Sequence, residues 1–107
     1  MTESDVTAQD LQAVAQELQL TRSQLQAVSA QVNEISLTLE AFASQDPSRP
    51  VFRAVGNLLL EVDDRQSLTD ELDESKSAFE SHAGRLTDRE SALVSQYEGM
   101  AKRFESQ

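Results

Sequence analysis

The sequence predicts a mainly α-helical protein in which two long helices form an antiparallel coiled coil with a β-hairpin at the bend. Two amphipathic patterns flank the stretch 50–63, which is rich in β-branched and large apolar residues. Only three glycines and two prolines occur in 107 residues, and aromatic residues make up 5% of the chain. This composition favours long, exposed helices in one domain over a large compact core. We therefore expect a single domain over residues 1–107.

The first helix is expected over about residues 6–44, after a frayed terminus at residues 1–5. Thr7 followed three residues later by Asp10 is a helix-start signal. Two prolines in residues 45–50 should end the helix near Ser44, because the residue before a proline is pushed toward extended geometry. Between these limits, apolar residues alternate at spacings of three and four, the a/d pattern of a left-handed coiled coil. The stripe consists of Leu11, Val14, Leu18, Leu25, Val28, Val32, Ile35, Leu39 and Phe42, with Thr21 in its one gap and Leu20 and Leu37 as apolar exceptions outside it.

A β-hairpin is expected over residues 51–62, because Gly56 and Asn57 separate two apolar runs and a glycine supplies the positive φ of a tight turn. This turn pairs Val55 with Leu58, Arg53 with Leu60 and Val51 with Val62 on one face, and Ala54 with Leu59 and Phe52 with Glu61 on the other. A lone apolar hairpin is only marginally stable in water, and its open edges can pair with a strand of another chain. The residues expected to drive assembly are Val51, Phe52, Val55, Gly56, Leu58, Leu59, Leu60 and Val62.

The second helix is expected over about residues 65–105. Asp63 or Asp64 can cap its start, with Ser67 and Asp70 as a second possibility. Its main stripe recurs every seven residues, at Leu72, Phe79, Leu86, Leu93 and Met100. The companion stripe lies either four residues on, at Lys76, Ala83, Glu90, Tyr97 and Phe104, or three residues on, at Ser75, His82, Arg89, Gln96 and Arg103. We favour the first, which becomes apolar toward the C-terminus. Gly84 and Gly99 should make this helix the less stable of the two, because each glycine lowers helix stability by about 1 kcal/mol relative to alanine.

Charge and composition exclude several classes of function. Nine basic against nineteen acidic residues give a net charge of −10, with acids spread along the chain, so we expect no binding to nucleic acid. No apolar run approaches membrane-spanning length and the first residues are acidic, so we expect a cytoplasmic protein without membrane contact. The chain has no cysteine and a single histidine, His82. We therefore expect no metal site, no cofactor and no catalytic residues, and a protein that is not an enzyme.

The middle of the chain resembles the beta-type subunits of prefoldin. Val51, Phe52, Arg53, Val55, Gly56, Leu58, Leu59 and Leu60 fit that family's run of valine, aromatic, basic, any residue, valine, glycine and apolar strand. The following D-D-R-Q-S-L-T-D-E-L is similar to the start of the family's second helix. The second helix departs from the family in its few apolar companion residues and its two glycines. Alpha-type subunits carry a second hairpin, and this sequence has no stretch that predicts one.

This resemblance implies an ATP-independent molecular chaperone. In that family the hairpins of six subunits join into a β-barrel platform, and the coiled coils hang free with their tips around unfolded polypeptides. The polypeptides are then delivered to a ring-shaped chaperonin. The implied partners are therefore alpha-type and other prefoldin subunits in a hetero-hexamer, unfolded client polypeptides and a chaperonin.

The resemblance also implies a client-binding role for the apolar residues near the two chain ends. These candidates are Val6, Leu11, Val14, Tyr97, Met100 and Phe104. They have two interpretations: they close the coiled coil, or they become exposed at a fraying tip and cover a client. The alternative function is a structural adaptor or tether that oligomerises through its hairpin. A tether would bury both stripes along their whole length.

Overall fold

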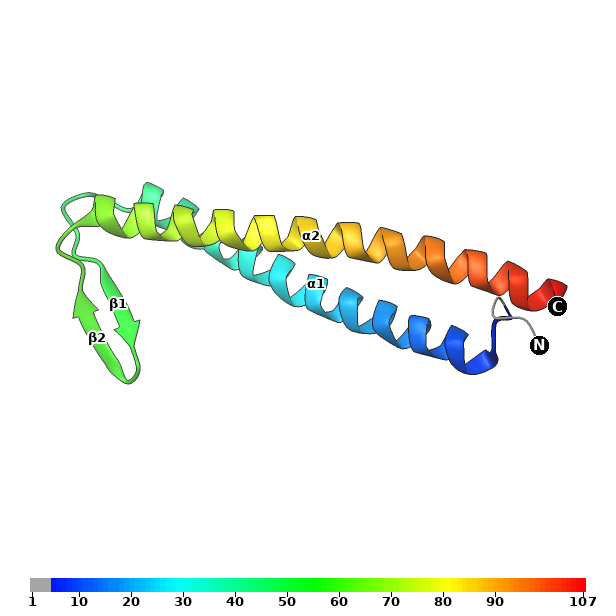
Figure 1. The fold of residues 1–107 in the computed structure, drawn as a ribbon. Helices are drawn as coiled ribbons and strands as arrows, with labels where there is room; N and C mark the ends of the chain where they lie inside the picture. The colour runs from blue at the N-terminus through cyan, green and yellow to red at the C-terminus, as the bar shows by residue number, and fades with distance from the viewer. Residues whose placement is uncertain (1–4) are drawn as a thin grey trace.

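The structure, a computed structural model, describes residues 5–107 and has the predicted architecture. Its elements are α1 (Ala8–Ser44), β1 (Phe52–Val55), β2 (Leu58–Glu61) and α2 (Arg65–Ser106). The helices lie side by side, the hairpin projects from the bend, and both ends of the chain lie at the opposite end (Figure 1). The molecule measures 73 × 24 × 17 Å. The frayed terminus expected over residues 1–5 lies, apart from Asp5, outside the described residues.

Helix α1 begins and ends where its local signals predict. Thr7 and Asp10 form a capping box: the Asp10 N–H donates to Thr7 Oγ1 and the Thr7 N–H donates to Asp10 Oδ2, both at 3.0 Å. These bonds satisfy two backbone donors that the first turn leaves without helical partners. The helix ends at Ser44, immediately before the segment with the two prolines.

The stripe predicted on α1 faces α2 along its whole length. Each of its ten positions, Thr21 included, is buried or half-buried, whereas Leu20 and Leu37 are exposed. On α2 the companion stripe four residues on is the one that packs, since Lys76, Ala83 and Glu90 are half-buried. The alternative stripe, three residues on, is exposed at all five positions: Ser75, His82, Arg89, Gln96 and Arg103.

The most deeply buried side chains of residues 5–107 all lie in the half of the coiled coil that is remote from the hairpin. They are Val6, Val14, Thr21, Leu86 and Leu93. Helix α2 also runs without a break through Gly84 and Gly99, and neither glycine has a positive φ. Packing between the helices is therefore tightest toward the two chain ends.

The hairpin has the predicted register. Phe52 pairs with Glu61, and Val55 pairs with Leu58 across the turn. Beyond the strands, the Val62 N–H donates to the Val51 carbonyl at 2.7 Å. Gly56 has φ +62° and is the one described residue with positive φ, as a two-residue turn with glycine in its first position requires.

Candidate functional sites at the two ends of the helical hairpin

The hairpin end carries a cluster of large apolar side chains that the chain itself does not cover. Their exposed fractions run from 47% at Leu60 to 74% at Leu59, and the cluster consists of Phe52, Val55, Leu58, Leu59 and Leu60. Both strands stand clear of the helices (Figure 1), so neither face of the two-stranded sheet has a covering layer. Large apolar side chains exposed on both faces in this way mark an interaction site.

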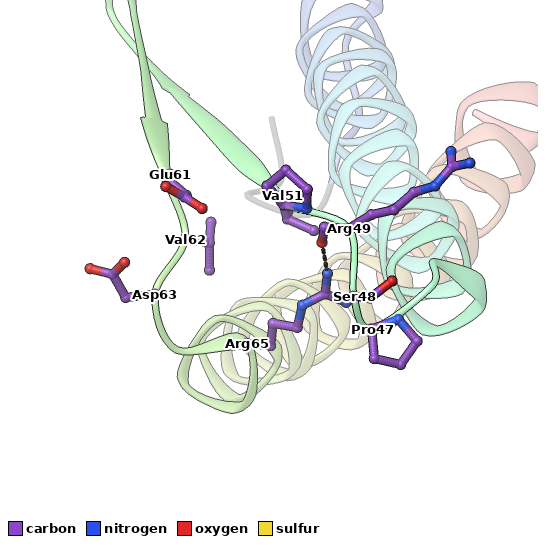
Figure 2. A pocket seen from close by; sticks show the side chains of 9 residues that line it. Pro47, Ser48, Arg49, Val51, Glu61, Val62, Asp63 and Arg65 are labelled. Atoms are coloured by element: carbon purple, nitrogen blue, oxygen red, sulfur yellow. Dashed lines mark hydrogen bonds between the residues drawn. The ribbon is translucent and has the colours of Figure 1, made fainter.

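Arg65 holds the base of the hairpin against the end of α1. Its guanidinium donates to the backbone carbonyls of Asp46, at 3.3 Å, and Arg49, and it lies 5.5 Å from the centroid of the Phe42 ring. Figure 2 shows the bond from Arg65 to the Arg49 carbonyl. One side chain therefore joins the first residue of α2 to the segment that follows α1.

The same segment is shaped by the Asp46 carboxylate. It accepts hydrogen bonds from the Ser48 N–H at 2.9 Å and from the Ser48 hydroxyl at 2.8 Å. The Ser48 backbone bond, with help from its hydroxyl, lowers the pKa of Asp46. Such local bonding by an Asp side chain is typical of a turn that leads out of a helix.

An open pocket of about 520 Å³ lies between this segment and the end of β2. Figure 2 shows Arg49 and Arg65 on one side of the pocket, and Glu61 and Asp63 on the other. The pocket therefore has charged residues of both signs and does not select for a ligand of one charge. A further contact, between Arg53 and Glu71 at 3.4 Å, links the hairpin to α2. Both side chains are about half exposed, so this ion pair fixes orientation more than it adds stability.

The six residues predicted at the tip fall into two groups. Val6 and Val14 are buried, and Leu11 and Met100 are half-buried. Tyr97 and Phe104 remain 36% and 42% exposed, although they continue the companion stripe that packs further along α2. The structure therefore brings all six residues to one end of the molecule but presents only the two aromatic rings substantially to solvent.

A contact that the sequence did not predict closes this end. The Val6 N–H donates to Gln107 Oε1 at 2.6 Å, and Gln107 Nε2 donates to the Val6 carbonyl at 2.8 Å. The two residues are 101 positions apart in the chain, and no local pattern distinguishes Gln107 from the other glutamines. Only the antiparallel arrangement of the helices brings them together.

Within residues 5–107, no three histidine, cysteine, aspartate or glutamate side chains are grouped as a metal site would require. His82 lies on the exposed face of α2. None of the helices in this part of the chain is long and apolar enough to cross a membrane.

Comparison with known proteins gives three agreeing results. The family described as Prefoldin subunit matches residues 7–106. A prefoldin subunit beta from Thermoplasma volcanium is 33% identical over 64 residues, which are 60% of this chain and 52% of that relative. The match thus spans about half the length of the relative.

The third result concerns the fold. The crystal structure of the prefoldin beta subunit from Thermococcus strain KS-1 superposes with a TM-score of 0.82 at 22% identity, and the match covers 95% of this chain and 94% of that one. It has the same two long helices with a β-hairpin between them. Because the family match spans both helices and the hairpin, this chain belongs to the prefoldin subunit family.

Proposed function

We propose that this chain is a beta-type subunit of an ATP-independent chaperone, which assembles through its hairpin and holds unfolded polypeptides at the tip of its coiled coil. The observation that carries the proposal is the placement of exposed apolar groups at opposite ends of one long molecule. The hairpin presents aliphatic residues and Phe52, and the tip presents Tyr97 and Phe104. An assembly surface and a client surface are thereby kept apart.

Assembly follows from the hydrophobic effect at the hairpin. Burial of a Val, Leu or Phe side chain stabilises an interface by roughly 1.5–3 kcal/mol, and five such side chains are exposed here. The open edges of β1 and β2 offer backbone hydrogen bonds to neighbouring strands. The partners that fit are the hairpins of alpha-type and other prefoldin subunits, joined with this one into the β-barrel platform of a hetero-hexamer.

Client binding follows from the chemistry of the tip. Tyr, Met and Phe side chains adapt to many apolar partners, and Met100 lies three residues from Tyr97 and four from Phe104 on α2. Each coiled coil binds a client weakly, and several coiled coils of one complex that bind the same client at once do so with higher avidity. Weak contacts of this kind permit release of the client to a chaperonin without nucleotide hydrolysis.

The proposal is tested with the complex purified from the native cell together with this chain. A chemically unfolded client protein is diluted into buffer, and its aggregation is followed by light scattering with and without the complex and with and without ATP. We expect suppression of scattering that does not depend on ATP. Aggregation at the same rate in the presence of excess complex would contradict the chaperone function.

The second candidate is a tether, and the burial of Val6 and Val14 favours it. A tether needs a coiled coil that is closed to its end, and these two residues are among the most buried in the described part of the chain. The exposed rings of Tyr97 and Phe104 favour the chaperone instead, because a tether has no use for them. The aggregation assay separates the two functions, since a tether gives no protection.

A further inference from the structure

We propose that the side-chain amide of Gln107 is a latch that holds the tip of the coiled coil closed, and that its release enlarges the apolar surface that a client can reach. The effect on clients rests on the proposed function, whereas the closing of the tip by Gln107 does not. The latch itself is a property of residues at the two chain ends, and it is tested without a client.

The latch is a two-way contact between one side chain and one residue's backbone. The amide of Gln107 accepts from the Val6 N–H at 2.6 Å and donates to the Val6 carbonyl at 2.8 Å. An amide can do both at once, because it carries an acceptor oxygen and a donor nitrogen. Figure 1 shows the chain before α1 rising to the end of α2, where this contact lies.

The latch acts on the first turn of α1 because Val6 directly precedes the residue that caps that helix. Thr7, the next residue, is held in the capping box with Asp10 by two hydrogen bonds of 3.0 Å. Val6 therefore occupies the position before the N-cap, which commonly packs against the fourth residue of the helix, here Leu11. A bond to Val6 from the end of α2 thus ties the first turn of α1 to the last turn of α2.

Release of the latch exposes apolar surface. Val6 is 6% exposed in the closed tip, although it lies outside both helices and belongs to a short extended segment. Without the Gln107 contact Val6 loses these two bonds and returns to solvent at the same end of the molecule as Tyr97 and Phe104, which are already exposed. A client that binds the open tip more tightly than the closed one shifts the population toward the open form.

The latch is weak enough to open reversibly. Both hydrogen bonds lie in a partly buried setting. Loss of two such bonds should raise the ratio of open to closed tips on the order of tenfold. The remaining apolar stripe keeps the rest of the coiled coil closed, so opening is confined to the end.

Distances between spin labels on the two arms test the latch. The chain has no cysteine, so Gln12→Cys on α1 and Glu98→Cys on α2, both at exposed positions, give two unique labelling sites. Labelled chain is diluted into excess unlabelled chain before assembly, so that each distance is measured within one chain. Gln107→Ala should increase the long-distance population on the order of tenfold. The matched control is Gln96→Ala, the same change at an exposed residue of α2, which should leave the distances unchanged.

Client protection is measured on the same two variants. We expect Gln107→Ala to reach half-maximal protection at a concentration several-fold lower than the parent protein. Unchanged distances in Gln107→Ala would overturn the latch. An opened tip with unchanged protection would overturn its effect on clients. If the parent protein gives no protection at all, the proposed function fails, and the distance measurement still decides whether the latch exists.

Discussion

Arg22 Nε on α1 lies 3.0 Å from Glu90 Oε2 on α2, and Arg89 pairs with Glu17 beside it. Arg89 and Glu90 are consecutive residues of α2, so their side chains project about 100° apart and reach two residues of α1 that are five positions apart, Glu17 and Arg22. Both pairs form only when this part of α2 lies opposite residues 17–22 of α1. The two ion pairs therefore specify how the arms align, over a layer that contains the buried Thr21.

Charge reversal tests this alignment. Arg22→Glu should lower the free energy of unfolding by roughly 0.5–1 kcal/mol, because it replaces an exposed ion pair with two like charges. Adding Glu90→Arg should restore most of the loss. Urea unfolding followed by circular dichroism measures both variants. Equal stability of the single and the double variant would show that Arg22 and Glu90 do not interact in solution.

Gly84→Ala should stabilise the coiled coil by up to about 1 kcal/mol. Gly84 lies within α2 without a positive φ, and an added Cβ would meet no atom within 4 Å. The contrasting change is Gly56→Ala, which should destabilise by roughly 1–2 kcal/mol because φ there is +62°. Thermal melts compare the variants. A lower melting temperature for Gly84→Ala would mean that the second arm bends at this residue.

The capping box makes the start of α1 sensitive to acid. Hydrogen bonds from the Thr7 backbone and hydroxyl lower the pKa of Asp10 in the folded protein. A carboxylate with a lowered pKa contributes stability above its unfolded pKa and loses that contribution as pH falls through the folded value, here below about pH 4. NMR titration of Asp10 should therefore show a lower pKa in the parent protein than in Thr7→Ala. Equal values would show that the Thr7 hydroxyl does not help to lower the pKa of Asp10, since the variant keeps the backbone N–H.

Assembly should depend on the hairpin face that carries Val55, Leu58 and Leu60. Leu58→Asp together with Leu60→Asp should weaken association, because an unpaired carboxylate buried in an interface costs several kcal/mol. The helices should remain folded, because the change lies outside α1 and α2. Circular dichroism, which reports mainly on these helices, checks this. The matched control is Leu20→Asp with Leu37→Asp, the same change at two exposed helical leucines. Light scattering after size exclusion gives the masses. An unchanged mass for the hairpin variant would exclude this face from the interface.

The fold could be predicted in detail because its signals are local. The capping pair Thr7 and Asp10, the stripe on α1 and the hairpin register around Gly56 each depend on residues close together in the sequence. The companion stripe on α2 has a weaker signal in the sequence, because Lys76 and Glu90 are polar at positions that pack. Packing against α1 decides that choice, and the periodicity of α2 alone does not.

The contacts at both ends of the molecule had no such signal. Arg65 bonds to the backbone carbonyls of Asp46 and Arg49, and Gln107 bonds to the backbone of Val6. A backbone carbonyl is available at every residue, so the identity of the acceptor cannot be read from its sequence position. The expected fraying of the tip also gave no hint that the deepest burial would lie in that half of the coiled coil.

The most direct test of the chaperone function replaces Tyr97, Met100 and Phe104 together with Ser. The matched control replaces Leu20 and Leu37, exposed leucines away from the tip, with Ser. Suppression of client aggregation and the mass of the complex are measured on both proteins. We predict that the tip variant loses protection while its mass stays that of the parent complex, because the hairpin is unchanged, and that the control keeps both. Full protection by a tip variant of unchanged mass would contradict client binding at the tip.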